Sequence, residues 1–162
     1  MSKVLMVASE AAPFIKTGGL ADVVGSLPPA LKQAGEDVAV VLPCYADASV
    51  PESRCIMQNL PVWLGKTCYP VRVHESVVRD VPFFLVECPP LFGRKGVYVG
   101  KDGDFPDNHQ RFAVLCRTAL AIARWIFRPG ILHCHDWQAA LVPVYLRSLF
   151  AGDPTFMGIK CL

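Results

Sequence analysis

A short apolar run that leads into a glycine pair and then a helix-like segment opens this chain. Residues 4–8 are all apolar, Gly18 and Gly19 follow in a more polar stretch, and apolar side chains recur at helical spacing over residues 20–34. A buried strand, a loop and a helix in this order are typical of α/β proteins. The opening of the chain therefore predicts a strand–loop–helix unit.

The loop of this unit contains the first candidate site residues, Lys16, Gly18 and Gly19. A helix start exposes unpaired N–H groups and carries a partial positive charge, and glycine lets a ligand approach the backbone closely. Lys16 adds a full positive charge, so the segment suits a ligand that bears phosphate. The alternative is a turn in which the glycines only relieve steric strain and Lys16 is solvated, and the residues alone leave both open.

The rest of the chain alternates between strand-like and helix-like segments. Pro28 and Pro29 fall inside the first helix, which is then either kinked or divided into two short helices. Gly35 is a suitable C-terminal cap for it. The expected strands cover residues 3–9, 38–42, 60–65, 69–78, 81–86, 131–134 and 157–162; the expected helices cover 20–34, 108–126 and 137–150; and loops cover 10–18, 43–58 and 88–106.

This alternation predicts an α/β fold with a mostly parallel sheet flanked by helices. Ligands of such sheets bind at the carboxyl ends of the strands. The loop at Lys16 and the segment His133–Asp136 both follow an expected strand, so we expect them on one rim of the sheet.

Composition narrows the function classes. Apolar residues make up 52% of the chain and charged residues 19%, which is apolar for a single domain and fits buried parallel strands. The net charge of +2 is too small to indicate a nucleic-acid partner. No apolar run approaches the length of a membrane span, and the first residues lack a secretory pattern.

The seven cysteines are scattered and form no CxxC pair, which argues against a zinc or redox motif and predicts reduced thiols in a cytosolic protein. His133 and His135 face the same way if they lie in a strand, but no third ligand follows nearby. We therefore expect no metal site.

Three acidic residues on the expected rim each have a functional and a structural interpretation. Asp136 opens a helix, where it can cap the first N–H groups, belong to the site, or do both. Asp22, one turn beyond the glycines, either contacts a ligand hydroxyl or the glycine loop, or favours the helix dipole from solvent. Glu10 either contacts ligand hydroxyls or binds backbone N–H groups of its own loop.

Three aromatic residues, Tyr98, Phe105 and Trp137, are candidates for stacking against a ligand ring. Tyr98 lies in the glycine-rich segment 88–106 and is the better candidate for ligand contact. Trp137 lies on a helix, and we expect it in the core. Asp107, which precedes the helix from residue 108, is expected to cap it.

The chain resembles one enzyme family over nearly its whole length. It is similar to the N-terminus of bacterial glycogen synthases and plant starch synthases, the retaining glucosyltransferases of glycosyltransferase family 5. The resemblance is carried by Lys3–Glu10, by KTGGLADVVGSLPPAL from Lys16, by Leu42-Pro43, by FGRKGVY from Phe92 to Tyr98, by Asp107-Asn108 with Arg111-Phe112, and by His133–Trp137.

The resemblance implies a Rossmann-like fold that is the N-terminal half of a two-domain glycosyltransferase-B architecture. The catalytic unit of this family is much longer than 162 residues, so residues 1–162 are expected to be a truncated N-terminal domain without the C-terminal nucleotide-binding domain. In the family, a His-Asn segment follows the strand that begins near residue 158. The expected partners are that missing domain, a nucleotide sugar and a glucan.

The resemblance further implies transfer of glucose from ADP-glucose, with UDP-glucose as second choice, to the non-reducing end of an α-1,4-glucan, in the bacterial cytoplasm and without a cofactor. We expect residues 1–162 alone to be inactive. The alternative is a non-catalytic glucan- or nucleotide-binding module. Lys16 and Asp136 are the expected catalytic residues, and the expected substrate contacts are Glu10, Lys16, Gly18, Gly19, Asp22, Tyr98 and His135.

Overall fold

The structure is a computed structural model that describes residues 1–162 in full. A seven-stranded sheet in the order β3-β4-β5-β2-β1-β8-β9 forms its centre. Only β4 runs against its neighbours, and all the other strands point the same way. The strands are β1 (Lys3–Val7), β2 (Asp37–Pro43), β3 (Ser53–Leu64), β4 (Thr67–Val78), β5 (Val81–Glu87), β8 (Ile131–Cys134) and β9 (Lys160–Cys161).

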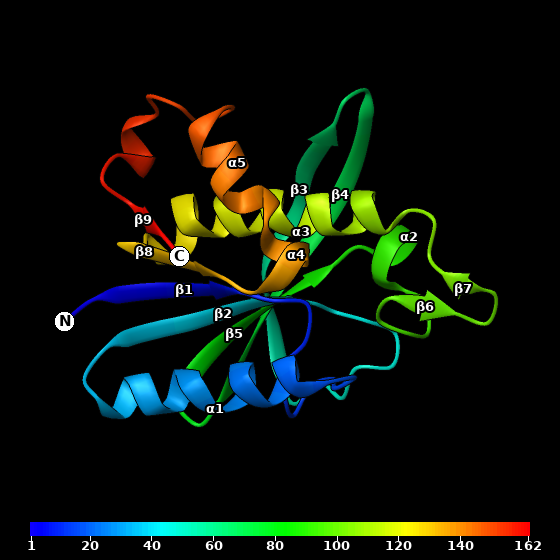
Figure 1. The fold of residues 1–162 in the computed structure, drawn as a ribbon, viewed down its shortest axis with the longest axis horizontal. Helices are drawn as coiled ribbons and strands as arrows, with labels where there is room; N and C mark the ends of the chain where they lie inside the picture. The colour runs from blue at the N-terminus through cyan, green and yellow to red at the C-terminus, as the bar shows by residue number, and fades with distance from the viewer.

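Helices cover both faces of this sheet (Figure 1). The helix α1 (Gly19–Gln33) lies on one face, over a core of 12 buried residues. The other face carries α3 (Asn108–Ile122), α4 (Asp136–Ala139) and α5 (Leu141–Arg147), over a core of 27 buried residues. The expected α/β class with a mostly parallel sheet between helices is therefore confirmed.

Several short elements complete the chain. The segment 88–106, which we expected as loop, contains three short elements. They are the helix α2 (Pro89–Phe92) and the paired strands β6 (Val99–Gly100) and β7 (Gly103–Asp104). A π-helical turn (Ala123–Phe127) extends α3, and a 3₁₀ turn (Pro154–Phe156) precedes β9. No helix is both long and apolar enough to cross a membrane.

Three expected boundaries are wrong. Residues 53–58 are not loop, because β3 already begins at Ser53; its first residues are mostly exposed on both faces and therefore show no alternation. The helix expected over 137–150 is divided at Ala140 into α4 and α5. The final strand is limited to Lys160–Cys161.

The first helix settles the question that its prolines left open. Pro28 and Pro29 lie inside one continuous helix, α1, rather than between two short ones. Gly35 follows its end with a φ of +91°, which favours glycine, and donates its N–H to the Lys32 carbonyl.

Candidate functional site

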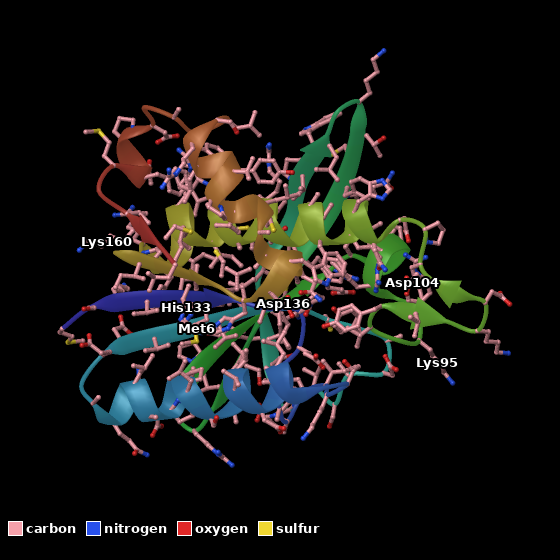
Figure 2. All side chains as sticks on the ribbon, in the orientation of Figure 1. Met6, Lys95, Asp104, His133, Asp136 and Lys160 are labelled. Carbon is pink, nitrogen blue, oxygen red and sulfur yellow. The ribbon has the colours of Figure 1, made fainter.

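The carboxyl ends of β1 and β8 meet at one edge of the sheet. These strands are parallel neighbours in which Val7 lies opposite Cys134, and the His135 N–H donates to the Val7 carbonyl at 2.9 Å. Figure 2 shows His133 on β8 and Asp136 where α4 begins. The chain leaving β1 runs through Glu10 to the amino end of α1. The two segments singled out from the sequence therefore lie at the same edge.

The amino end of α1 is open. Gly18 occupies the cap position with extended backbone, and no side chain accepts a hydrogen bond from the first-turn N–H groups. A Cβ added to Gly18 would come no nearer than 3.9 Å to another atom, and one added to Gly19 would meet nothing within 4 Å. Neither glycine relieves strain or crowding in this fold. Their small size leaves the N–H groups accessible, which favours the ligand interpretation.

Lys16 and Asp22 form an ion pair beside this helix end. The Lys16 Nζ lies 2.6 Å and 2.7 Å from the two carboxylate oxygens of Asp22. Both side chains are more than half exposed, at 55% and 60%. Asp22 thus contacts Lys16 rather than the glycine loop. An ion pair this exposed contributes at most about 1 kcal/mol, so Lys16 can turn to a more highly charged anion at little cost.

Glu10 is buried beneath the same loop, with 3% of its surface exposed. Its carboxylate accepts hydrogen bonds from the N–H and the hydroxyl of Thr17, the latter at 2.8 Å. The Tyr98 hydroxyl also donates to it at 3.3 Å. Glu10 therefore binds its own loop, as the structural interpretation required, and ties that loop to Tyr98.

Tyr98 joins the two sides of the site. Its hydroxyl lies 2.6 Å from the Ser9 Oγ. Burial raises the pKa of Tyr98 to about 12, and the Glu10 carboxylate acts in the same direction, whereas the hydrogen bond with Ser9 opposes them. The phenol is therefore protonated at neutral pH, and while its hydrogen points to Glu10 its oxygen can accept a hydrogen bond.

An aromatic cluster stands beside Tyr98. Its ring lies 6.3 Å from that of Trp137, and Trp137 meets Phe112 edge to face at 5.1 Å. The placement of Trp137 in the core is wrong, because 54% of this side chain is exposed. The indole packs on Phe112 with one side and leaves the other to solvent.

A buried arginine holds the segment that carries Tyr98. Arg111 is fully buried and donates to the carbonyls of Leu91 and Val97, both at 2.7 Å. It also donates to the Asn108 side chain, whose amide in turn donates to the Tyr98 carbonyl at 2.9 Å. The position of Tyr98 thus depends on residues at the start of α3.

The expectation that Asp107 caps α3 is wrong. No capping hydrogen bond from its side chain is present. Its carboxylate instead accepts two hydrogen bonds from Arg94, at 2.6 Å and 2.8 Å. Asp107 therefore fixes the loop that precedes α3, and a competing cation explains why it leaves the helix end uncapped.

The two histidines of the β8 end are close neighbours, with ring centroids 4.2 Å apart. Burial lowers the pKa of His135 to about 4, with a further contribution from His133, and burial lowers the pKa of His133 as well. Both rings are neutral at pH 7. The His135 Nε2 is buried without a hydrogen-bond partner. No group of three or more His, Cys, Asp or Glu side chains is arranged to hold a metal ion.

Asp136 agrees in part with the capping interpretation. It is the first residue of α4, one position after the cap residue His135, and its side chain still accepts from a first-turn N–H. The Asp136 carboxylate accepts a hydrogen bond from the Trp137 N–H at 3.0 Å. Its φ of +63° is in the left-handed region, which costs a non-glycine residue about 1 kcal/mol or more and is found disproportionately at functional sites.

The sequence did not reveal three residues that build the site, Ser9, Thr17 and Tyr45. Ser9 and Thr17 hold Tyr98 and Glu10, and the Tyr45 hydroxyl donates to the Ser9 carbonyl at 2.9 Å. Ser9 and Tyr45 each follow a buried strand, β1 and β2, closely. A position just after a parallel strand was the available signal.

Together these groups suit a ligand with an anionic part and a hydroxylated part. The open helix end and Lys16 attract negative charge. The unpaired His135 nitrogen and the Tyr98 hydroxyl can exchange hydrogen bonds with hydroxyl groups.

Comparison with known proteins gives one consistent result. The family of starch synthase catalytic domains matches residues 3–162. Glycogen synthase 2 of Geobacter sulfurreducens is 45% identical over 157 residues, covering 95% of this chain and 32% of that protein. The glycogen synthase of Paracoccus denitrificans is 44% identical over 165 residues, covering 94% of this chain and 33% of that protein.

A solved structure agrees. The catalytic domain of starch synthase IV from Arabidopsis thaliana, bound to ADP and acarbose, superposes with a TM-score of 0.83 at 29% identity. The match covers 99% of this chain and 32% of that one. The chain thus spans about a third of the length of the curated relatives it matches.

Proposed function

This chain belongs to the starch synthase catalytic domain family, and from that premise we propose that the full-length protein transfers glucose from ADP-glucose to the non-reducing end of an α-1,4-glucan with retention of configuration. The curated relatives bear the name glycogen synthase, and the Arabidopsis enzyme was solved with ADP and acarbose. The donor and acceptor proposed here follow those names and ligands.

Lys16 and the open end of α1 would hold the diphosphate of the donor. The departing ADP carries more negative charge than Asp22 offers, so Lys16 would exchange its exposed partner for a phosphate. Charge that grows on the leaving group in the transition state gains most from such a fixed cation. Gly18 and Gly19 leave room for the phosphate and the sugar to approach the backbone.

The sugar would lie between the ends of β1 and β8. The neutral His135, with its free Nε2, and the Tyr98 phenol would bind hydroxyl groups, while Glu10 keeps their loop in place. Asp136 is exposed at the same edge and would act near the anomeric carbon and the acceptor. No resident metal or other cofactor takes part in this proposal.

We further propose that residues 1–162 belong to the N-terminal domain of a two-domain enzyme that works in the bacterial cytoplasm. In this proposal a C-terminal domain grips the nucleotide from the other side of the cleft. The exposure of Lys16 and Asp22 supports the idea that the site is completed from outside this chain.

The observation that carries the proposal is Lys16 beside an uncapped helix end, at the edge where β8 presents His135 and Asp136. The test is incorporation of radiolabelled glucose into glycogen by the full-length protein. We expect Lys16→Ala to lower kcat by about 10²–10³, the loss typical of one transition-state donor. Lys66→Ala, an exposed lysine in the β3–β4 turn, is the control and should be unchanged. Equal activity of the Lys16 variant and the wild type would refute the assigned role.

The second candidate is a glucan- or nucleotide-binding module without catalysis. The half-exposed Trp137 beside Tyr98 favours it, because such a platform binds sugars without chemistry. The same assay decides between them. Binding of maltooligosaccharide with no transfer by the full-length protein would select the module, whereas turnover selects the enzyme.

A further inference from the structure

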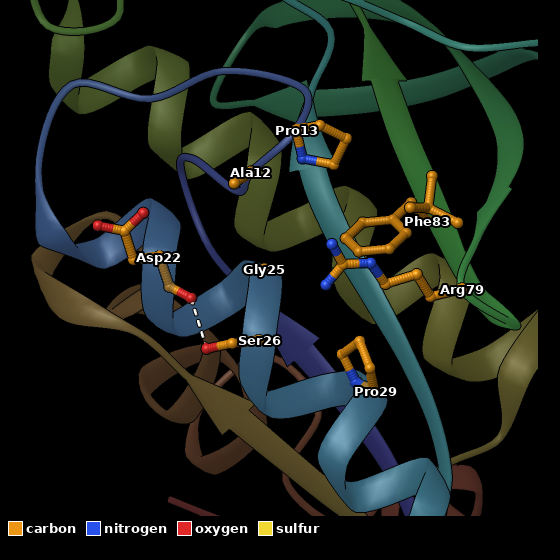
Figure 3. A pocket seen from close by; sticks show the side chains of 9 residues that line it. Ala12, Pro13, Asp22, Gly25, Ser26, Pro29, Arg79 and Phe83 are labelled. Carbon is orange, nitrogen blue, oxygen red and sulfur yellow. Dashed lines mark hydrogen bonds between the residues drawn. The ribbon is translucent and has the colours of Figure 1, made fainter.

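A hollow of about 330 Å³ lies between α1 and the β4–β5 turn (Figure 3). Its apolar lining comes from the rings of Pro13, Pro29 and Phe83 and from Val78. This size is in the range of small-molecule sites. The remaining lining residues are Ala12, Asp22, Gly25, Ser26 and Arg79.

Arg79 is the only cation in this hollow, and it is free. No hydrogen bond or ion pair engages its guanidinium, although the side chain extends beside the Phe83 ring (Figure 3). Arg79 is exposed, and its five N–H donors lie at the mouth of the hollow, where they meet solvent and no protein acceptor. A guanidinium in this state is suited to a planar or tetrahedral oxyanion.

The backbone under Arg79 is unusual for arginine. Arg79 and Asp80 form a two-residue hairpin turn between paired Val78 and Val81, and their φ values are +50° and +62°. Turns of this kind favour Asn-Gly or Asp-Gly. An arginine in the left-handed region adds strain that the fold does not need. The turn thus keeps a less stable residue whose side chain serves no partner within the protein.

A second hollow of about 470 Å³ adjoins the first and shares Pro29 and Arg79 with it. It adds Lys32, together with Gln33 and Asp80. The Lys32 Nζ is held only loosely, 3.8 Å from Asp37, and Asp37 is also 3.7 Å from Lys3. Two cations with weak or no partners thus line one space. The nearby carboxylates are Asp80 in this hollow, Asp22 in the first hollow and Asp37 beside Lys32.

We propose that these two hollows form a binding site for a small phosphomonoester carried on a ring. The ring would lie against Pro13 and Pro29, and the phosphate would lie between Arg79 and Lys32. A phosphate with up to two negative charges can neutralise both Arg79 and Lys32, and Arg79 can bind it with two parallel hydrogen bonds. The first hollow adjoins the Lys16–Asp22 ion pair through Asp22, but Lys16 itself does not line either hollow. The site does not depend on the proposed transferase activity.

Calorimetry of the full-length protein with ribose 5-phosphate tests this site, with ribose as the probe that lacks the phosphate. We expect Arg79→Gln to weaken binding of ribose 5-phosphate about tenfold or more, since it removes a charge-assisted pair. Lys32→Gln should weaken it several-fold. Ribose should bind at least tenfold more weakly than its phosphate.

Two further variants locate the binding. Arg128→Gln is the matched control, because Arg128 is also exposed, unpaired and left-handed, with a φ of +52°, but lies after the π-helical turn. It should change affinity less than twofold. Lys16→Ala uncovers the Asp22 carboxylate at the rim of the first hollow, so it should weaken binding, but by much less than Arg79→Gln. Equal weakening by Arg79→Gln and Arg128→Gln would show that only the net charge of the protein matters, and this would overturn the site. Loss of binding in Lys16→Ala would place the ligand at the open end of α1, and no binding at millimolar concentration would also overturn the site.

Discussion

Several polar groups at the carboxyl edge of the sheet have no firm hydrogen-bond partner. In a purely structural site, such groups would be paired. The His135 Nε2 has no partner, the first N–H groups of α1 are uncapped, and Lys16 holds only an exposed carboxylate. Buried polar groups in folded proteins are nearly always hydrogen-bonded. Their coincidence at one edge is therefore better explained by a ligand than by packing.

The low pKa of His135 makes the stability of the protein depend on pH. The folded protein holds this pKa near 4, whereas an unfolded histidine titrates near about 6.5. Between these values the unfolded chain binds a proton that the folded chain does not, so stability falls as the pH drops from about 6.5 to about 4. We expect His135→Gln to reduce the loss of Tm between pH 7 and pH 5, as followed by circular dichroism.

The exposed His109→Gln is the control for this prediction. It should leave the difference in Tm between the two pH values as it is in the wild type. If both variants show the same pH dependence as the wild type, burial of His135 does not set the acid sensitivity.

Substitutions of Asp136 can distinguish its effect on stability from its effect on activity. Asp136→Gly relieves a left-handed backbone at φ +63° but removes the carboxylate that accepts from Trp137. The two effects are each about 1 kcal/mol and of opposite sign, so we expect a Tm within about 2 °C of the wild type. Glucose transfer by the full-length variant should fall by at least about 100-fold.

A matched variant makes this result interpretable. Asp136→Ala loses the carboxylate and keeps the strain, so it should be less stable than Asp136→Gly and equally inactive. Full activity in the glycine variant would show that Asp136 has only a structural role.

The residues of the site were partly readable from the sequence. Lys16, Gly18 and Asp136 stand next to expected strand and helix ends, so topology alone placed them on one edge. Tyr45 and Ser9 were not predicted, because their contact joins the ends of two strands and they are 36 positions apart in the sequence. Trp137 was misplaced because helical spacing does not tell which face of α4 meets the core.

At the level of elements, the local sequence pattern predicted strands correctly where their residues are buried. The strands β1, β2 and β5 are apolar runs of buried residues and were found close to their observed bounds. The first half of β3 has no buried face, so its pairing with β4 decides its conformation and no periodicity reveals it. The break at Ala140 has a local cause, because Pro143 lacks the N–H that a continuous helix would donate to the Ala139 carbonyl. The sequence therefore held a signal for this boundary.

The β4–β5 turn gives a prediction about stability. Replacing Arg79 and Asp80 by Asn and Gly supplies the residues that a turn with two positive φ values prefers. We expect the double variant to gain about 1 kcal/mol, seen as a Tm higher by about 3 °C in thermal unfolding. Because it also removes the free guanidinium, it should bind ribose 5-phosphate poorly. A lower Tm would show that Arg79 or Asp80 makes a stabilising contact in solution.

At the scale of the whole molecule, the two sheet faces and the carboxyl edge have different roles. Helices and two buried cores cover the central strands on both faces. The edge where β1 and β8 end carries Lys16, His135 and Asp136, and its charged groups remain in contact with solvent. Such an edge can form one wall of a ligand-binding cleft.

An open edge of this kind should not be sufficient for glucose transfer. Lys16 is more than half exposed and Asp136 is exposed, so water screens both charges and competes for an activated sugar. Closed sites strengthen these interactions by excluding water. We therefore expect residues 1–162 alone to incorporate no radiolabelled glucose from ADP-glucose into glycogen, while the full-length protein does so under the same conditions.

The control is the folded state of the isolated chain, which circular dichroism should show to contain both helix and strand. An inactive but folded chain supports a cleft that needs a second wall. Turnover by residues 1–162 would contradict the proposed division of labour, because one wall would then hold donor and acceptor together and exclude water unaided.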